Sequence, residues 1–218
     1  MIRASYAATS PRDSWKTLNG EASARFPVPG AQQETDWAQG TWHWAPMKIY
    51  LIGFMGAGKT TIGRELARRI GAPFFDLDDL VETAEKMSIK DIFAQHGEPH
   101  FRKRERDILR STHYLEDAVI ATGGGTFTFE ENIQFIQSEG FSIFLSAPYA
   151  VLRSRIGDKA AERPMFRDDV AAHDLYNTRL RFYKMCDITL EIREDESPLE
   201  IVERIVHQLP RGRARRTS

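Results

Sequence analysis

The chain has 218 residues, 41% of them hydrophobic and 28% charged, which is typical of a globular protein and excludes a disordered or fibrous one. A net charge of −1 gives no general attraction to nucleic acid or anionic lipid, no apolar run reaches the ~18 residues of a membrane helix, and the single Cys186 excludes an internal disulfide. We therefore expect a cytoplasmic protein with neither a nucleic-acid nor a membrane partner.

The first 46 residues differ in composition from the rest of the chain. They show no sustained hydrophobic period, so we predict a mostly disordered leader over 1–46, with Met47 as a candidate for the true start of synthesis. We predict one domain over 47–209 and a basic, disordered tail over 210–218. The leader holds all the tryptophans: Trp15, Trp37, Trp42 and Trp44. The tail's arginines lack interleaved aromatic residues and are weak evidence for nucleic-acid binding.

From Met47 onward, short apolar runs alternate with amphipathic stretches. The predicted strands are 48–52, 73–77, 118–121, 141–145 and 188–192. The predicted helices are 59–70, 79–86, 88–96, 98–114, 130–138, 148–156, 169–184 and 198–209. Short strands that alternate with helices indicate an α/β fold, here a five-stranded parallel sheet with helices on both faces.

A phosphate-binding loop comes directly after the first predicted strand. Residues 53–60 read GFMGAGKT and match G-x-x-x-x-G-K-[ST] at every fixed position, with a predicted helix behind them. Glycines let successive N–H groups point at a phosphate, and the helix N-terminus favours an anion. Lys59 would bridge the outer phosphates, and the Thr60 hydroxyl would ligate Mg²⁺. The absence of an N-K-x-D motif and the small size of the domain favour a compact kinase over a GTPase or motor.

Two carboxylates, Asp76 and Asp78, stand at the end of the second predicted strand. The carboxyl ends of parallel strands share one edge of the sheet, so these side chains should face the phosphate loop. There they could hold Mg²⁺ through water or accept a proton from an attacking hydroxyl. Asp78 could equally cap the helix over 79–86, and the residues alone leave both interpretations open.

Arginines and glycines supply the remaining candidates. Arg102 and Glu105 lie three residues apart on a predicted helix, where an arginine could grip a substrate carboxylate, although a solvated charged face is the simpler interpretation. The glycines at 123–125 allow a ligand to approach the backbone. Four more arginines form either a mobile lid over ATP or an exposed basic loop. They are Arg153, Arg155, Arg163 and Arg167.

Taken in order, these segments resemble the shikimate kinase family. The matching stretches are GFMGAGKTTIGRELA, FFDLDDLVE, SIKDIFAQHGEPHFRKRE and ATGGGT, then Arg163-Pro164 and Arg179 with Tyr183, over nearly all of 47–209. The resemblance implies a P-loop kinase fold with a small lid. It also implies transfer of the ATP γ-phosphoryl group to the 3-hydroxyl of shikimate, a step toward chorismate and the aromatic amino acids.

The resemblance implies residue roles as well, with ATP as co-substrate and Mg²⁺ as cofactor. The ATP-binding residues would be Gly56, Ala57, Gly58, Lys59, Thr60, Thr61, Arg155 and Arg163, with Arg155 the weaker match in spacing. The shikimate-binding residues would be Asp78, Arg102, Gly124 and Arg179, with Glu105 supporting Arg102. Thr60 would ligate Mg²⁺ and Asp76 would act on it through water. The catalytic residues would be Lys59, Asp78 and Arg163. Separately from the resemblance, we expect a monomer.

One departure and two rival functions stay open. Where the family has R-x-P-x-Y, residues 179–183 read RLRFY, so Arg181 competes with Arg179 for the substrate. A gluconate or nucleoside monophosphate kinase is the nearest rival, although paired aspartates suit a polyol better than a base. A non-enzymatic nucleotide-binding module would be expected to lose Lys59, Asp78 or Arg102, and all are present.

Overall fold

The computed structural model describes residues 47–157 and 168–210. The predictions for 1–46, for Arg163 and Arg167, and for 211–218 therefore lie outside the described residues. Within the described ranges, a five-stranded parallel sheet has the strand order β2-β3-β1-β4-β5, which confirms the predicted class. The strands are β1 (Lys48–Ile52), β2 (Phe74–Asp76), β3 (Ala118–Ala121), β4 (Gly140–Ser146) and β5 (Ile188–Glu191).

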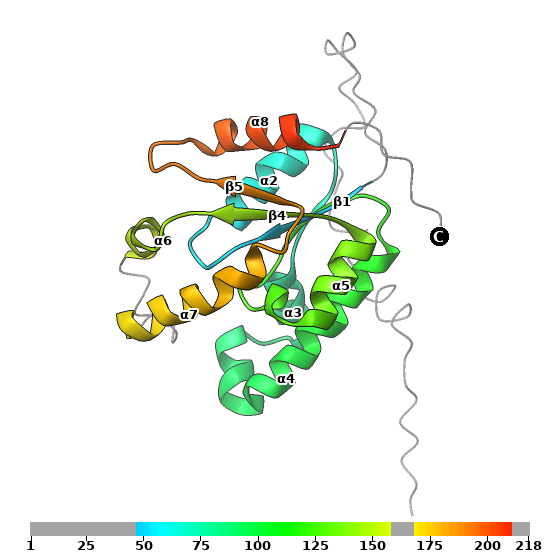
Figure 1. Ribbon diagram of the computed structural model, residues 1–218. Coiled ribbons are helices and arrows are strands. Elements are labelled where there is room, and N and C mark those ends of the chain that lie inside the picture. The colour runs from blue at the N-terminus through cyan, green and yellow to red at the C-terminus, as the bar shows by residue number, and fades with distance from the viewer. Residues whose placement is uncertain (1–46, 158–167, 211–218) are drawn as a thin grey trace, which may run out of the picture.

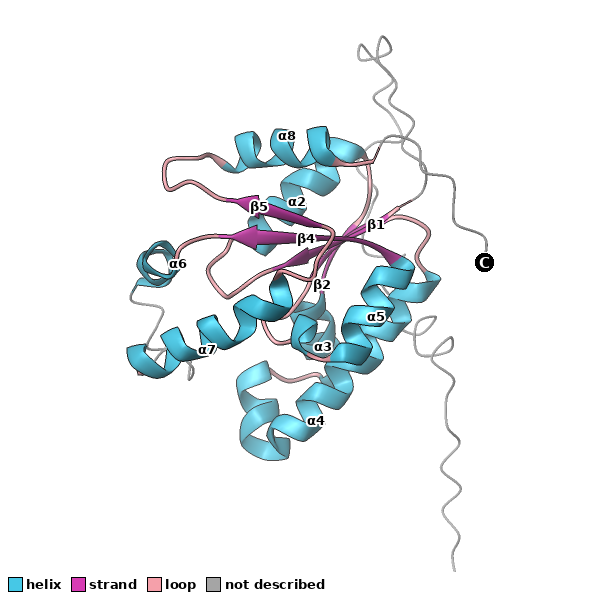
Figure 2. Cartoon of the chain, viewed as in Figure 1, coloured by secondary structure: helices cyan, strands magenta, loops and turns pink. Residues whose placement is uncertain are grey.

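Helices cover both faces of this sheet. Helices α2 and α8 lie on one face, and α3, α4 and α5 lie on the other (Figure 1). Figure 2 shows the strands as one layer between them, with α6 beyond the carboxyl end of β4. The helices are α2 (Lys59–Ile70), α3 (Leu77–Glu85), α4 (Ile89–Ser111), α5 (Glu130–Glu139), α6 (Tyr149–Ile156), α7 (Asp169–Tyr183) and α8 (Pro198–Gln208), with short 3-10 turns η1 (Thr112–Tyr114) and η2 (Thr126–Thr128).

The central strands form the core because nearly all of their residues are apolar, with Lys48 at the start of β1 as the exception. Every residue of β1 and β3 is buried, whereas the edge strands β2 and β5 are partly exposed. A strand that is covered on both faces must be apolar at consecutive positions, which is the pattern that predicted it. In the described part of the chain, no helix has both the length and the apolarity needed to cross a membrane.

Two boundary errors fall next to the predicted site. The second strand ends at Asp76 and α3 begins at Leu77, so the helix predicted from residue 79 starts two residues earlier. Asp76 is the N-cap, since its side chain accepts a hydrogen bond from the Asp78 backbone N–H at 3.1 Å. The interpretation of Asp78 as the cap is therefore wrong, because the strand passes into the helix without an intervening loop.

The helices predicted over 88–96 and 98–114 are parts of one kinked span, α4. Gly97 interrupts it with φ 77° and ψ 171°, values that a glycine adopts without steric cost. Ser88 caps the first part, and its side chain accepts a hydrogen bond from the Asp91 backbone N–H. The kink separates this first part from the second, which carries Arg102 and Glu105.

Candidate active site

The phosphate loop joins the end of β1 to the start of α2. Gly53, Gly56 and Gly58 have φ values of 151°, 83° and 87°, so the loop turns through conformations that side chains disfavour. The Lys59 ammonium folds over the loop and donates to the carbonyl oxygens of Gly53 at 2.8 Å and Phe54 at 3.1 Å. The loop thus forms a backbone cradle with its one lysine drawn across it.

Two oxygen-bearing side chains meet beside this cradle. The Thr60 hydroxyl, in the first turn of α2, donates to Asp76 Oδ2 at 2.7 Å, while the other carboxylate oxygen of Asp76 caps α3. A hydroxyl and a carboxylate are hard oxygen ligands, which Mg²⁺ prefers. The residues predicted to hold Mg²⁺ therefore lie together, and their chemistry fits that ion.

Asp78 lies in the first turn of α3, among other carboxylates. Burial, together with the negative charges of Asp76 and Glu105, raises the pKa of Asp78 to about 6, and the positive charge of Lys59 opposes this shift. A carboxyl group with a pKa near neutrality takes up and releases protons more readily than an ordinary aspartate. The site thus contains a carboxylate whose environment suits acid–base work.

The glycines after β3 lie against the charged side chains of the site. A Cβ atom on Gly123 would lie 2.5 Å from Glu105 Oε1 and 3.0 Å from Asp78 Oδ1. A Cβ atom on Gly125 would lie 2.6 Å from Arg102 Nη1. Because any larger residue would displace these groups, the glycines are what lets helices α3 and α4 bring them to one place.

Arg102 is held from several sides. Its guanidinium contacts Glu105 at 2.9 Å and Glu98 at 3.1 Å, and it lies 5.1 Å from the ring centre of Phe101. Glu105 is only 1% exposed, so its charge is compensated almost entirely by neighbours. The predicted support of Arg102 by Glu105 is therefore present as a buried ion pair.

Thr126 also binds the glutamate of that ion pair, and it is not among the predicted site residues. Its hydroxyl donates to Glu105 Oε1 at 2.6 Å, which leaves the other oxygen of Glu105 for Arg102. Thr126 comes directly after the three glycines and is the last residue of the stretch ATGGGT, which is the sequence signal that points to it.

A cavity of about 260 Å³ opens beside Arg102. Its wall also includes Arg106, Phe129 and the start of α5. The two arginines of this wall are matched by Glu130 and Glu131, and Arg106 lies 3.6 Å from Glu131, so Arg102 is the arginine that links the cavity to the candidate site.

The structure separates the two competing arginines of α7. Arg179 is 7% exposed and lies against the phosphate loop, 5.8 Å from the ring centre of Phe54, with Gly124 close by. Arg181 is exposed, and its guanidinium lies 4.7 Å from the ring centre of Phe182. Of the two, only Arg179 points into the candidate site.

The remaining predicted ATP residues lie at the margin of the described site. Thr61 and Arg155 are exposed, on α2 and α6. Helix α6 nevertheless reaches the loop, since a Cβ atom on Gly56 would lie 3.0 Å from the Ile156 side chain. The structure thus brings Arg155 near the loop without burying it.

Known proteins share this arrangement. The family model "Shikimate kinase" matches residues 55–210. A shikimate kinase from Aquifex aeolicus is 37% identical over 166 residues, which cover 75% of this chain and 96% of that protein. A crystal structure of shikimate kinase from Aquifex aeolicus superposes with a TM-score of 0.67 at 38% identity, covering 74% of this chain and 95% of that one. A shikimate kinase from Acinetobacter baumannii in complex with shikimate gives 0.70 at 32% identity, covering 74% and 91%. The chain belongs to the shikimate kinase family.

Proposed function

We propose that the chain transfers the γ-phosphoryl group of ATP to the 3-hydroxyl of shikimate. One observation carries this proposal: Asp78, Arg102 and Arg179, which lie far apart in the sequence, all border the glycines at 123–125. Two arginines suit a carboxylate, and an aspartate suits a hydroxyl. The substrate that these groups fit is a small hydroxy acid bound beside the phosphate loop.

ATP would lie in the loop, on the backbone and side chains of Gly56 to Thr61. Lys59 already lies within the loop, where its ammonium can follow the charge that develops on the transferred phosphoryl group. Arg163 would add a second positive charge over the phosphates, and Arg155 is a further candidate for binding ATP. A kinase site accelerates phosphoryl transfer mainly by offsetting the negative charges of the phosphate groups.

Thr60 and Asp76 would hold Mg²⁺, Thr60 directly and Asp76 through water. When bound, the ion would neutralise part of the charge on the ATP phosphates. The hydrogen bond between these two side chains supports this assignment because it places both oxygens at one point of the site. A weak protein site that is completed by substrate phosphates is the usual arrangement for Mg²⁺.

Asp78 would position the 3-hydroxyl and accept its proton. In this step the hydroxyl oxygen bonds to the γ-phosphorus, the bond from that phosphorus to the β–γ bridging oxygen breaks, and the hydroxyl proton passes to the Asp78 carboxylate. A pKa of about 6 favours that transfer more than an ordinary aspartate would. ADP leaves with the bridging oxygen.

A coupled ADP-release assay tests the function. Shikimate, gluconate, AMP and CMP are offered separately with ATP and Mg²⁺, and the product is analysed by NMR for a phosphate ester on the 3-oxygen. Turnover with shikimate alone supports the proposal. Preference for gluconate or a nucleotide would contradict it in favour of the rival kinases, and turnover with none of the four would favour a binding module.

We further propose a monomeric, cytoplasmic enzyme without a nucleic-acid or membrane partner. The single cysteine supports a compartment in which disulfides are not needed.

A further inference from the structure

Tyr183, the last residue of α7, has a buried polar group in contact with the candidate site. The residue is 0% exposed, and its hydroxyl donates to the Gly124 carbonyl oxygen at 2.5 Å. Its ring packs against Phe144 of β4, with the ring centres 5.1 Å apart. Tyr183 thus connects the core of the sheet to the glycines at 123–125.

The same hydroxyl also interacts with the side chain of Arg179, which lies one helical turn earlier on the same face of α7. Burial raises the pKa of Tyr183 to about 12, while the charge and hydrogen bonding of Arg179 oppose the shift. The hydroxyl therefore stays protonated at working pH and remains the donor to Gly124. Arg179 lies close to the same glycine, since a Cβ atom there would be 3.2 Å from its Nη1.

Gly124 needs such a constraint because its neighbours are also glycines. Glycine backbones populate several conformations, so a run of them does not hold a peptide group in one orientation by itself. The peptide group is planar, and a hydrogen bond to the Gly124 carbonyl fixes the direction of the Gly125 N–H in the same plane. Tyr183 therefore orients both the backbone beside the acceptor and the guanidinium that faces it.

We propose that Tyr183 is a positioning residue for the carboxylate of the acceptor substrate, acting through Gly124 and Arg179. This inference rests on the proposed function, because it takes the acceptor to be shikimate. The alternative is a tyrosine that only fills the core. A packing role depends on the ring, whereas the positioning role depends on the hydroxyl.

Tyr183→Phe separates these roles because it removes one oxygen atom and keeps the ring. Tyr176→Phe is the matched control, since Tyr176 is buried on the same helix and its hydroxyl donates to the Ala147 carbonyl oxygen at 3.1 Å. For Tyr183→Phe, we expect the Kd and KM for shikimate to rise about tenfold, with the KM for ATP within about twofold of wild type. For Tyr176→Phe, we expect both KM values to stay within about twofold of wild type. Because each variant loses one buried hydrogen bond, we expect Tm to fall by a similar amount in both.

The methyl ester of shikimate adds a readout that packing would not change. The ester lacks the charge that Arg179 would grip, so the tenfold difference between wild type and Tyr183→Phe should disappear with it. An equal rise in KM for shikimate in both variants, a KM for ATP that rises as much, a difference that persists with the ester, or a Tyr183→Phe protein that fails to fold would each overturn the inference.

The wild-type assay distinguishes failure of the inference from failure of the function. If wild type does not phosphorylate shikimate, the proposed function and the inference both fall. If wild type does and Tyr183→Phe has an unchanged KM for shikimate, only the inference falls.

Discussion

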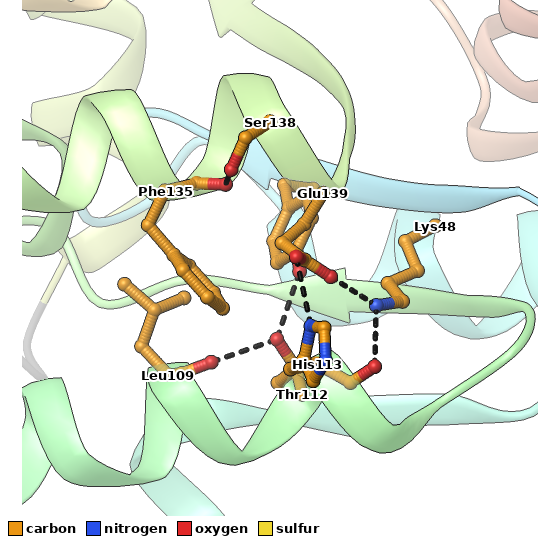
Figure 3. Close-up of polar contacts among 8 residues, drawn as sticks. Lys48, Leu109, Thr112, His113, Phe135, Ser138 and Glu139 are labelled. Atoms are coloured by element: carbon orange, nitrogen blue, oxygen red, sulfur yellow. Dashed lines mark hydrogen bonds and ion pairs between the residues drawn. The ribbon is translucent and has the colours of Figure 1, made fainter. Parts of the chain in front are cut away.

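The two ends of the sheet carry polar clusters of opposite character. At the amino end of β1, the buried Lys48 ammonium contacts Glu139 Oε2 at 2.5 Å and the His113 carbonyl oxygen at 3.0 Å (Figure 3). The His113 ring contacts the other oxygen of Glu139 at 2.9 Å. Burial alone would raise the pKa of Glu139, but hydrogen bonds from Lys48 and His113 outweigh it and lower this pKa. Each charge of this amino-end cluster has an opposite partner.

At the carboxyl end, like charges are crowded together. Asp78 lies near Asp76 and Glu105, and its pKa is raised to about 6 instead of lowered. Removing one partner from a buried ion pair destabilises the fold, whereas a buried carboxylate crowded by like charges is costly and persists where a ligand or a reaction uses it. The difference between the two ends therefore distinguishes a structural cluster from a functional one.

Lys59→Ala should have the largest effect on the carboxyl end. The substitution removes the positive charge within the phosphate loop, so we expect kcat to fall by about 10³-fold or more while Tm stays close to wild type. Steady-state kinetics and a thermal melt check this. Turnover close to wild type in a folded Lys59→Ala protein would contradict the phosphate-loop assignment.

Asp78→Asn tests whether the raised pKa serves catalysis. Asparagine can orient a hydroxyl but cannot take a proton, so we expect kcat to fall by on the order of 10²-fold. In wild type, kcat/KM should rise with pH around 6 as the carboxyl group ionises, and the variant should lose this limb. Turnover within about threefold of wild type would exclude Asp78 as the base.

The same variant has a stability consequence of defined sign. The folded pKa of Asp78 lies above its unfolded value, so its contribution to stability is present at low pH and is lost as the pH rises through about 6. We therefore expect Asp78→Asn to have a higher Tm than wild type at pH 8 and a smaller difference at pH 4. Equal Tm differences at both values would contradict the electrostatic cause.

Arg179→Ala should weaken shikimate binding more than tenfold, or about 1.5–3 kcal/mol, with little change for ATP. Arg181→Ala is the matched control, because Arg181 is exposed two residues further along the same helix. Arg102→Ala should behave like Arg179→Ala. Calorimetric titration with shikimate and with ATP measures this, and a larger loss for Arg181→Ala than for Arg179→Ala would reverse the assignment.

Glu139→Gln should affect stability alone. Lys48 would lose its buried partner, so we expect the free energy of unfolding to fall by about 1–3 kcal/mol at pH 7, with kcat unchanged. Because the pKa of Glu139 is lowered in the folded state, its contribution is present above its unfolded pKa and is lost as the pH falls through the folded value. The variant should therefore lose less stability in acid than wild type does.

Glu203→Gln is the control for that experiment. Its pair with Arg69 lies on the surface, with side chains 48% and 46% exposed, and should be worth about 0–1 kcal/mol. Urea denaturation of both variants gives the comparison. Equal losses would show that the amino-end cluster is no more stabilising than a surface pair.

Deletion of residues 1–46 should have the smallest effect. We predict unchanged Tm and kcat, because the break in composition at Met47 separates the leader from the domain and the family match begins only at residue 55. A thermal melt and the shikimate assay on the shortened chain test this. A large fall in Tm would show that the leader packs on the domain.

Much of this molecule could be predicted because its signals are local. The phosphate loop is defined within eight consecutive residues. Within that short span, Lys59 donates hydrogen bonds to the backbone carbonyls of Gly53 and Phe54. The apolar runs predict β1 and β3 at their observed bounds, since a parallel strand that is covered on both faces is apolar at most positions. The N-cap of α3 is Asp76 and not Asp78, and the sequence could not distinguish them because both are aspartates, which cap helices equally well.

The pattern of residues along the chain was enough to predict the fold class, the phosphate loop and the set of candidate side chains. Which of these side chains meet depends on how the elements pack together. Arg179 and Arg181 are about 200° apart around a helix, so one of them must turn away from the site, and the packing of α7 selects Arg179. The bonds from Thr126 to Glu105 and from Tyr183 to Gly124 join residues 21 and 59 positions apart. No period or motif encodes such a contact, because it exists only once the sheet has brought its strand ends together.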